Sequence, residues 1–352
     1  MSLSQLGAVS RSGQSLLTGD TKALFLKVFS GEVLQTFEEK NVMKGLHTTR
    51  TIASGKSAQF PCTGIAYSAF HVVGDNILDD SIDIAPGNLN DQTRETGGKY
   101  NAPGTYLSQI AAAERVISID ELMLSAAFVP DIDDMMNHYD TRSIYASEIG
   151  RALARAYDKR VMQVGVLAAR ATSNFAGSGA YVGFGGDAVV DSLMRTDGAA
   201  IVSAIFEAAE ILDEKDIPED NRVVLLSPEQ YYLVVQQKDV IDRDYGGEGN
   251  GTLKDGTVKM VAGIQIVKTN HLPTEDFSGY NLTGANNTYN ADFSDNAGLV
   301  FHRSAIGTVK LKDLTVETDR KIEYQGDLIV AKYALGTGIL RPESAVELSV
   351  AP

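Results

Sequence analysis

The stretch that decides the fold is residues 131–169, DIDDMMNHYDTRSIYASEIGRALARAYDKRVMQVGVLAA. Three aspartates, Asp131, Asp133 and Asp134, stand at its start, where the positive end of a helix dipole favours negative charge. Apolar residues then recur at three- and four-residue steps and form one stripe: Ile149, Leu153, Tyr157, Val161, Val164 and Ala168. The pattern predicts a helix of roughly 50 Å, at about 1.5 Å per residue. Such a helix suits a scaffold that spans a plate better than a compact enzyme.

The segments after this helix carry further helix and strand signals. Residues 197–216 predict a second amphipathic helix, and residues 223–226 form an apolar run that is typical of a buried strand. Ser227 and Pro228 follow that run and suit the N-cap and the first helical position. A short helix is therefore expected directly after the buried strand.

Strands and loops occupy most of the remaining chain. Residues 114–130 are expected as one strand that ends at Pro130, and residues 258–269 as a strand with a turn. Residues 300–352 are expected as strands separated by glycines. Residues 84–112, rich in Gly, Pro, Asn and Thr, are expected as a long surface loop, which is usually functional or partner-binding. The pattern as a whole is α+β, without an internal repeat.

Composition and charge exclude several classes of protein. The chain has 352 residues, 43% hydrophobic content and no apolar run long enough to cross a membrane. The single cysteine, Cys62, suits a reducing compartment, and the N-terminus lacks the apolar core of a signal peptide. The net charge of −15 argues against a protein that grips nucleic acid. We therefore expect a soluble protein that is made in a cytoplasm.

The charge is unevenly distributed along the chain. Residues 1–50 hold six basic and four acidic side chains, a net of +2, so the acidic excess lies in the rest of the molecule. Two interpretations stay open. The imbalance is either a chance fluctuation in a short segment or the mark of an arm that docks on the acidic bodies of neighbouring copies.

A short motif in the sequence TIASGKSAQFPCTG, residues 51–64, raises the question of nucleotide binding. Gly55-Lys56-Ser57 matches the end of a phosphate-binding loop, G-x-x-x-x-G-K-[ST], which opens a helix. The first glycine of that motif is replaced by Arg50, and Pro61 would stop a helix that began at Ser57. The motif is therefore interpreted as a polar turn in an extended hairpin arm.

Other candidate sites lack the partners that their chemistry needs. Cys62 has no neighbouring base, and Ser227 has no surrounding G-x-S-x-G motif. The segment around Asp242 and Asp244 faintly resembles a calcium loop but has Leu253 where the bidentate glutamate belongs. The histidines show no metal-ligand spacing: His47, His71, His138, His271 and His302. We expect no catalytic site, no cofactor and no metal.

Five stretches, in this order, resemble the major capsid proteins of short-tailed, podovirus-type bacteriophages. They are GDTKALFLKVFSGEVL (19–34), SGKSAQFP (54–61), DIDDMMNHYDTRSIYASEIG (131–150), HRSAIGTVKLKDL (302–314) and LIVAKYALGTGILRPE (328–343). Their order along the whole chain makes the resemblance specific. It fades at 84–112, 170–200 and 270–297, and the first of these segments looks like an insertion.

The resemblance implies the HK-ninety-seven-like capsid fold of tailed phages, an α+β fold with arms. The parts it implies are an N-terminal arm at 1–50, an extended β-hairpin arm or E-loop at 51–120 with the insertion at about 84–112, a peripheral domain at 121–190 and 300–352 with a long spine helix at about 131–169, and an axial domain at 191–299.

The function implied by the resemblance is structural. Such a protein self-assembles into hexamers and pentamers of an icosahedral virion capsid, in the host cytoplasm, and encloses double-stranded DNA without binding it specifically. The residues expected to contact an adjacent subunit through the hairpin arm are Arg50, Lys56, Ser57 and Phe60. No crosslink from Lys56 or Lys99 to an asparagine is expected.

Partners and alternatives follow from the same resemblance. A scaffolding protein and a portal are implied during assembly, and the insertion at 84–112 suits a thicker subunit overlap or a surface for a decoration protein. An encapsulin-type compartment shell of the same fold is one alternative. A soluble α+β enzyme with an unrecognised pocket is another.

Overall fold

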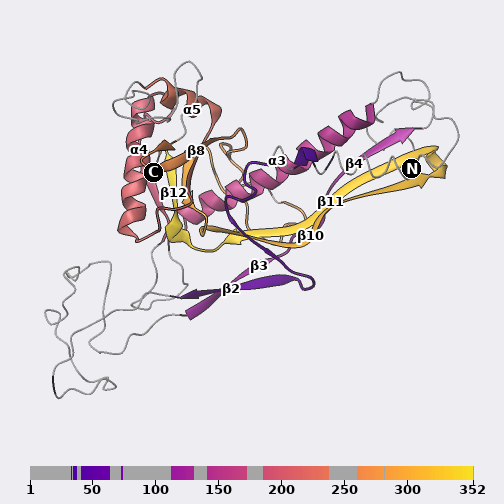
Figure 1. The fold of residues 1–352 in the computed structure, drawn as a ribbon, viewed down its shortest axis with the longest axis horizontal. Helices are drawn as coiled ribbons and strands as arrows, with labels where there is room; N and C mark the ends of the chain where they lie inside the picture. The colour runs from indigo at the N-terminus through magenta and orange to yellow at the C-terminus, as the bar shows by residue number, and fades with distance from the viewer. Residues whose placement is uncertain are drawn as a thin grey trace.

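The molecule is elongated, with a lobe at one end from which a long helix and a long β-hairpin project side by side (Figure 1). The computed structural model describes residues 33, 35–37, 41–63, 73, 112–130, 141–172, 185–237, 260–280 and 282–351. Among these residues, no helix is long and apolar enough to span a membrane. The fold is α+β, as the sequence predicts.

The long helix α3 (Thr141–Ala169) connects the lobe to the hairpin. The predicted start at 131–140 lies outside the described residues, but the predicted apolar stripe is buried along its whole length. Towards its C-terminal end the helix enters the lobe, where a Cβ on Gly165 would lie 2.6 Å from a Leu299 methyl group. Glycine therefore allows the helix to approach the sheet closely.

The lobe is built on a six-stranded sheet with helices on both faces. Its strands, in spatial order, are β5 (Asp187–Val190), β12 (Ala345–Ser349), β9 (Asn296–His302), β6 (Arg222–Leu226), β8 (Ile264–Lys268) and β7 (Met260–Val261). Val223 and Leu225 pack in one core with α3, whereas Val224 and Leu226 pack in a second core with α4 (Gly198–Glu214) and α5 (Pro228–Val235). Because both faces are covered, β6 is apolar at nearly every position.

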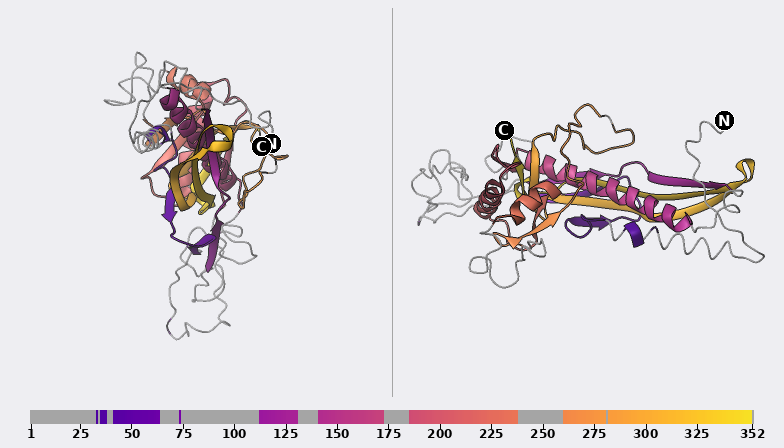
Figure 2. Two further views of the ribbon diagram at one scale, coloured as in Figure 1. Left: turned by 90° about the vertical axis from the view of Figure 1, so that its right-hand side faces the viewer. Right: turned by 90° about the horizontal axis from the view of Figure 1, so that it is seen from above.

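The projecting hairpin belongs to a separate four-stranded sheet. Its spatial order is β1 (Thr48–Thr51), β10 (Ile306–Lys321), β11 (Gly326–Ile339) and β4 (Met123–Pro130). The short helices η2 (Ile322–Tyr324) and η3 (Pro342–Ser344) follow β10 and β11. Ile329, Ala331 and Tyr333 of β11 pack in the core that contains α3, so the helix covers one face of this sheet (Figure 2).

A two-stranded ribbon, β2 (Ser57–Thr63) paired with β3 (Ala112–Ser118), lies beside the hairpin (Figure 1). The prediction of one strand over 114–130 is wrong, because the chain leaves the ribbon after β3 and enters the four-stranded sheet as β4. Residues 119–122 form the elbow between the two. Its backbone donates in different directions, from Ile119 to Lys56 and from Asp120 to Leu335, which breaks the strand.

Local signals around the lobe are confirmed. As predicted, Ser227 caps α5 by accepting from Gln230, with Pro228 in the first turn. The Asp197 side chain, a cap that was not predicted, accepts from the amide of Ala199 at the start of α4. The turn between β7 and β8 has positive φ at Ala262 and Gly263, 51° and 73°. This geometry suits a tight hairpin turn.

The predicted segments 121–190 and 300–352 do not stay with one sheet. Strands β5 and β12, at the ends of these segments, pair with each other in the six-stranded sheet, beside strands from 191–299. Strands β10 and β11 remain in the four-stranded sheet with β4. The six-stranded sheet therefore joins strands from three separate parts of the chain.

Candidate functional site

The ribbon is anchored to the body by a small apolar cluster on the sheet face opposite α3. The cluster consists of six buried residues, Ala58, Ile117, Ile119, Val309, Ala334 and Leu340. Ile52 and Phe60 pack against it while partly exposed. The remaining side chains of β2 are mostly exposed, so the ribbon offers its outer face to solvent. The ribbon lies within the predicted hairpin arm, residues 51–120, and is distinct from the long hairpin of β10 and β11. Its base is the candidate site for contacts between subunits.

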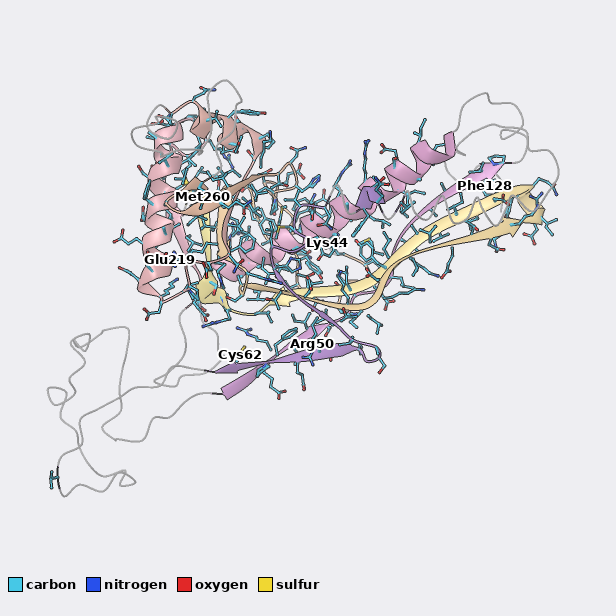
Figure 3. The ribbon with its side chains drawn as sticks, viewed as in Figure 1. Lys44, Arg50, Cys62, Phe128, Glu219 and Met260 are labelled. Carbon is cyan, nitrogen blue, oxygen red and sulfur yellow. The ribbon has the colours of Figure 1, made fainter. Side chains whose placement is uncertain are left out.

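Two of the four predicted contact residues meet each other within the chain. The Arg50 guanidinium lies 5.6 Å from the centroid of the Phe60 ring. Its Nη1 donates a hydrogen bond of 2.9 Å to the backbone carbonyl of Gln59. A cation over an exposed aromatic ring contributes about 0.5–1 kcal/mol. Arg50 is exposed beside the ribbon, as Figure 3 shows.

The other two predicted contact residues, Lys56 and Ser57, are exposed where the turn enters β2. Gly55 has a φ of 117°, which suits glycine, and a strand rather than a helix begins at Ser57. The interpretation as a polar turn, rather than the start of a phosphate-binding helix, is therefore confirmed. The Lys56 carbonyl accepts from the amide of Ile119 at 2.8 Å, so its backbone joins the elbow while its side chain faces solvent.

Sequence reasoning missed the polar residues that hold the elbow. Asp120 accepts hydrogen bonds from the backbone of Asn286 at 2.7 Å and of Asn287 at 3.2 Å. The Tyr289 hydroxyl donates to the other oxygen of the same carboxylate. The partners lie 166 or more positions apart in the sequence, and the segment that carries them shows no helix or strand periodicity. A polar Asn-rich run was the available signal, and it does not identify a partner.

A second polar site ties the segment before β1 to α3. The buried Asp158 accepts from the amides of Val42 at 2.9 Å and Met43 at 3.0 Å. The buried His47 ring donates through Nδ1 to the carbonyl of Met43, 2.9 Å away, and its Nε2 lies 2.9 Å from the hydroxyl of Thr308. This chain of contacts fixes the path of the backbone into the hairpin arm.

Burial dominates the titration of both groups. It lowers the pKa of His47 to about 4, and the positive charges of Lys310 and Arg303 act in the same direction. Burial also raises the pKa of Asp158 to about 6, against the opposing effect of its two backbone hydrogen bonds. Burial thus shifts the pKa of each side chain in the direction that favours its neutral form.

The described residues offer little for catalysis or metal binding. They contain no group of three or more His, Cys, Asp or Glu side chains that would hold a metal ion. Burial raises the pKa of the Cys62 thiol, which lowers its reactivity at neutral pH. His71, His138, the Asp242 segment, Lys99 and residues 84–111 of the expected insertion lie outside the described residues.

One cavity of about 300 Å³ lies between the start of β6 and the β7–β8 turn. Its lining includes Glu219, Asp220 and Arg303 but neither histidine nor cysteine. Figure 3 places Glu219 and Met260 in the lobe, away from Arg50 and Cys62. The cavity therefore does not share residues with the base of the arm.

Comparison with known proteins connects this architecture to viral shells. Residues 92–349 match the family model described as Gp10A-like major capsid protein. The chain is 34% identical to the major capsid protein of Escherichia phage T7, covering 93% of this chain and 92% of that protein. It is 33% identical to the major capsid protein of Enterobacteria phage T3, with 97% and 95% covered.

A solved structure agrees with these relatives. The capsid structure of cyanophage P-SCSP1u superposes with a TM-score of 0.71 at 37% identity, covering 100% of this chain and 99% of that one. The expected resemblance to phage capsid proteins and the HK-ninety-seven-like fold class are confirmed. The chain belongs to the Gp10A-like family of major capsid proteins.

Proposed function

We propose that this chain assembles as hexamers and pentamers into an icosahedral shell that encloses double-stranded DNA. Membership of the family makes the chain a structural capsid shell protein of a bacteriophage virion. The observation that carries the proposal is the similarity to phage capsid proteins along nearly the whole chain. An encapsulin-type compartment is not favoured, because the relatives with substantial identity are phage capsid proteins.

The shape of the subunit supports assembly through overlapping arms. The hairpin projects from the lobe and the ribbon lies against the four-stranded sheet, so the subunit is elongated (Figure 2). We propose that Arg50, Lys56, Ser57 and Phe60, at the base of the ribbon, contact a neighbouring subunit. Each such contact can be weak, because closure of a shell makes many contacts cooperative.

The charge of the chain suits a container. A net charge of −15 disfavours tight binding of the DNA phosphates, which would hinder packing and release. We propose that the DNA is enclosed without specific recognition. We also propose that a scaffolding protein and a portal take part in assembly in the host cytoplasm, and that a decoration protein is a further candidate partner.

The test is assembly of the full chain, co-expressed with the scaffolding protein of the same phage. Sedimentation and negative-stain microscopy are expected to show closed shells. A species no larger than a small oligomer under every condition, with scaffold present, would contradict the proposal.

A variant tests the proposed contact at the ribbon. Lys56→Glu reverses an exposed charge and is expected to lower shell yield, whereas Lys56→Arg keeps the charge and is the matched control. The unfolding midpoint of the unassembled subunit should stay the same in both. Equal shell yields for both variants would remove Lys56 from the contact.

A further inference from the structure

The elbow at residues 119–122 is held by three different parts of the molecule. The amide of Ile119 donates to the Lys56 carbonyl of the ribbon at 2.8 Å. The amide of Asp120 donates to Leu335 of the four-stranded sheet at 3.2 Å, and that of Glu121 donates to the Gly284 carbonyl at 2.9 Å. Residues 284–289 thus form a third support, which we name the latch loop.

The Asp120 carboxylate accepts several hydrogen bonds from the latch loop. One oxygen accepts from the amide of Asn286 at 2.7 Å, and from the amide and the side-chain nitrogen of Asn287 at 3.2 and 3.1 Å. The other oxygen accepts from the hydroxyl of Tyr289. Hydrogen bonds to an ionised carboxylate are shorter and stronger than neutral ones. One side chain of the elbow therefore gathers three residues of the latch loop.

The latch loop also supplies hydrogen-bond partners to the backbone at the end of β3. The Asn287 amide group donates to the Ser118 carbonyl at 2.7 Å and accepts from the Ser118 amide at 3.3 Å. The Asn286 side chain donates to the carbonyl of Ile119 at 2.6 Å. These bonds satisfy backbone groups at the point where β3 ends, which would otherwise be left without partners.

Glycines form the surface on which the elbow rests. A Cβ on Gly336 would lie 1.8 Å from the Ser118 carbonyl oxygen, and one on Gly338 would lie 2.9 Å from the Ile117 side chain. At Gly336 backbone therefore meets backbone, whereas Gly338 leaves room for the Ile117 side chain. This close contact at Gly336 leaves the end of β3, and so the elbow, only one position on the sheet.

The latch loop is itself tied to the long helix and the long hairpin. The Arg160 guanidinium of α3 lies 5.4 Å from the centroid of the Tyr289 ring, which is buried. The Tyr289 hydroxyl also accepts from the amide of Thr337 in β11 at 3.2 Å. These contacts fix the position of the latch loop, and through it the elbow, relative to both α3 and β11.

A small rotation at the elbow has a large effect further along the arm. Seven residues of β3 span about 23 Å at roughly 3.3 Å each, so a rotation of about 10° moves the far end by about 4 Å. That displacement approaches the spacing of neighbouring strands, about 4.8 Å. An arm that meets a neighbouring subunit therefore needs a defined angle.

We propose that the latch loop fixes the angle of the hairpin arm on the body, with Asp120 as its positioning residue, and that this angle keeps shell curvature uniform. The effect on the shell rests on the proposed function. The effect on the arm concerns the subunit alone and is measured without assembly.

The first experiment is hydrogen exchange on the unassembled full chain. Asp120→Ala removes the acceptor of the latch bonds and is expected to raise exchange of the β3 amides tenfold or more. The matched control is Asp276→Ala, which removes a carboxylate that accepts from Ser278 within its own turn, 2.8 Å away. Where Asp120→Ala does not fold, Asp120→Asn keeps the shape and removes the charge, and a smaller rise is expected. Unchanged β3 exchange in the folded Asp120 variant would overturn the proposal.

The second experiment disturbs the contact between Gly336 and Ser118 instead of the Asp120 carboxylate. Its readout is particle diameter. Gly336→Ala places a methyl group against Ser118 and is expected to broaden the diameters of assembled particles, as Asp120→Ala is. Gly279→Ala is the control, because a Cβ there meets nothing within 4 Å. Uniform wild-type diameters for both Asp120→Ala and Gly336→Ala would overturn the curvature role. Failure of the wild-type chain to form shells would instead count against the proposed function, and the exchange experiment would still decide the latch.

Discussion

The lobe and the hairpin arm are held in place by different means. In the lobe, β6 and β12 are buried at every position, because α3 covers one face of the sheet and α4 and α5 cover the other. The ribbon contributes only Ala58 and Ile117 to the six-residue apolar cluster at its base, and the rest of β2 is mostly exposed. Its position depends on glycines and polar side chains of other segments.

This difference separates folding from positioning. Removing apolar contacts of Leu225 affects the free energy of unfolding of the whole subunit, because the core that contains this residue and α3 extends from the lobe to the long hairpin. Removing contacts at the arm base leaves that core intact and changes where the arm lies. For a shell protein, we propose that the arm base, rather than the lobe, is where assembly geometry is set.

The largest expected effect is a truncation inside the lobe. Leu225 is fully buried between the helices, so Leu225→Ala should lower the free energy of unfolding by about 2–5 kcal/mol. Chemical denaturation of the unassembled subunit measures this. The matched control, Leu311→Ala, removes a leucine that is 38% exposed on β10 and should cost far less. Equal losses would contradict the idea that the lobe carries the stability.

The next effect concerns the joint between α3 and the lobe. Arg170 forms two hydrogen bonds, 2.6 and 2.7 Å long, with the buried carboxylate of Glu347 in β12. Arg170→Met leaves that charge buried and unpaired. The expected loss is about 2–3 kcal/mol, below the full cost of breaking a buried pair because the arginine is partly exposed.

The double variant sharpens this prediction. Arg170→Met with Glu347→Met removes both charges and should recover most of the lost free energy of unfolding. Denaturation of the two single variants and the double variant forms a complete cycle. Additive losses would show that the pair does not act as a unit.

The lobe was largely predictable from the sequence because its signals are local. The stripe on α3, the cap at Ser227 and the buried run at 223–226 depend on neighbouring residues, and the structure shows all three. The break between β3 and β4 has no such signal. It depends on Asn287, which lies 169 positions from its partner Ser118.

The candidate site was predictable only in part. The resemblance pointed to the segment that forms the ribbon, and Arg50 and Phe60 do meet there. Asp120 and Tyr289 were missed, because a lone aspartate and a tyrosine in a polar run have no periodicity. Polar contacts between distant segments require the fold before they can be recognised.

A smaller effect is expected at the arm itself. Arg50→Ala removes the contact with the Phe60 ring and the bond to the Gln59 carbonyl. A loss of about 0.5–1 kcal/mol corresponds to a two- to fivefold rise in hydrogen exchange of β2 amides. Arg50→Lys, which keeps the charge without the planar group, should fall between Arg50→Ala and wild type. A large drop in global stability would show that the arm base and the lobe are not separate.

The smallest expected effect is the pH dependence contributed by the site that leads into the arm. The folded pKa of His47 is about 4, below its ordinary 6.5, so its contribution to stability is present above pH 6.5 and lost as pH falls towards 4. The folded pKa of Asp158 is about 6, above its ordinary 3.8, so its contribution is present at low pH and lost as pH rises towards 6. Between pH 4 and 6 the two slopes oppose each other, and their sum should be nearly flat.

Single variants at this site separate the two slopes. Relative to wild type, His47→Gln leaves the Asp158 contribution, so unfolding free energy should rise as pH falls from 6 to 4. Asp158→Asn leaves the His47 contribution, so unfolding free energy should fall over the same range. Urea denaturation at intervals of half a pH unit measures the slope of each variant and of wild type. All other titrating groups are the same in the three proteins, so a difference in slope comes from His47 or Asp158. Parallel pH profiles in the three proteins would show that neither group titrates differently in the folded and unfolded chain, and that hydrogen bonding alone ties this segment to α3.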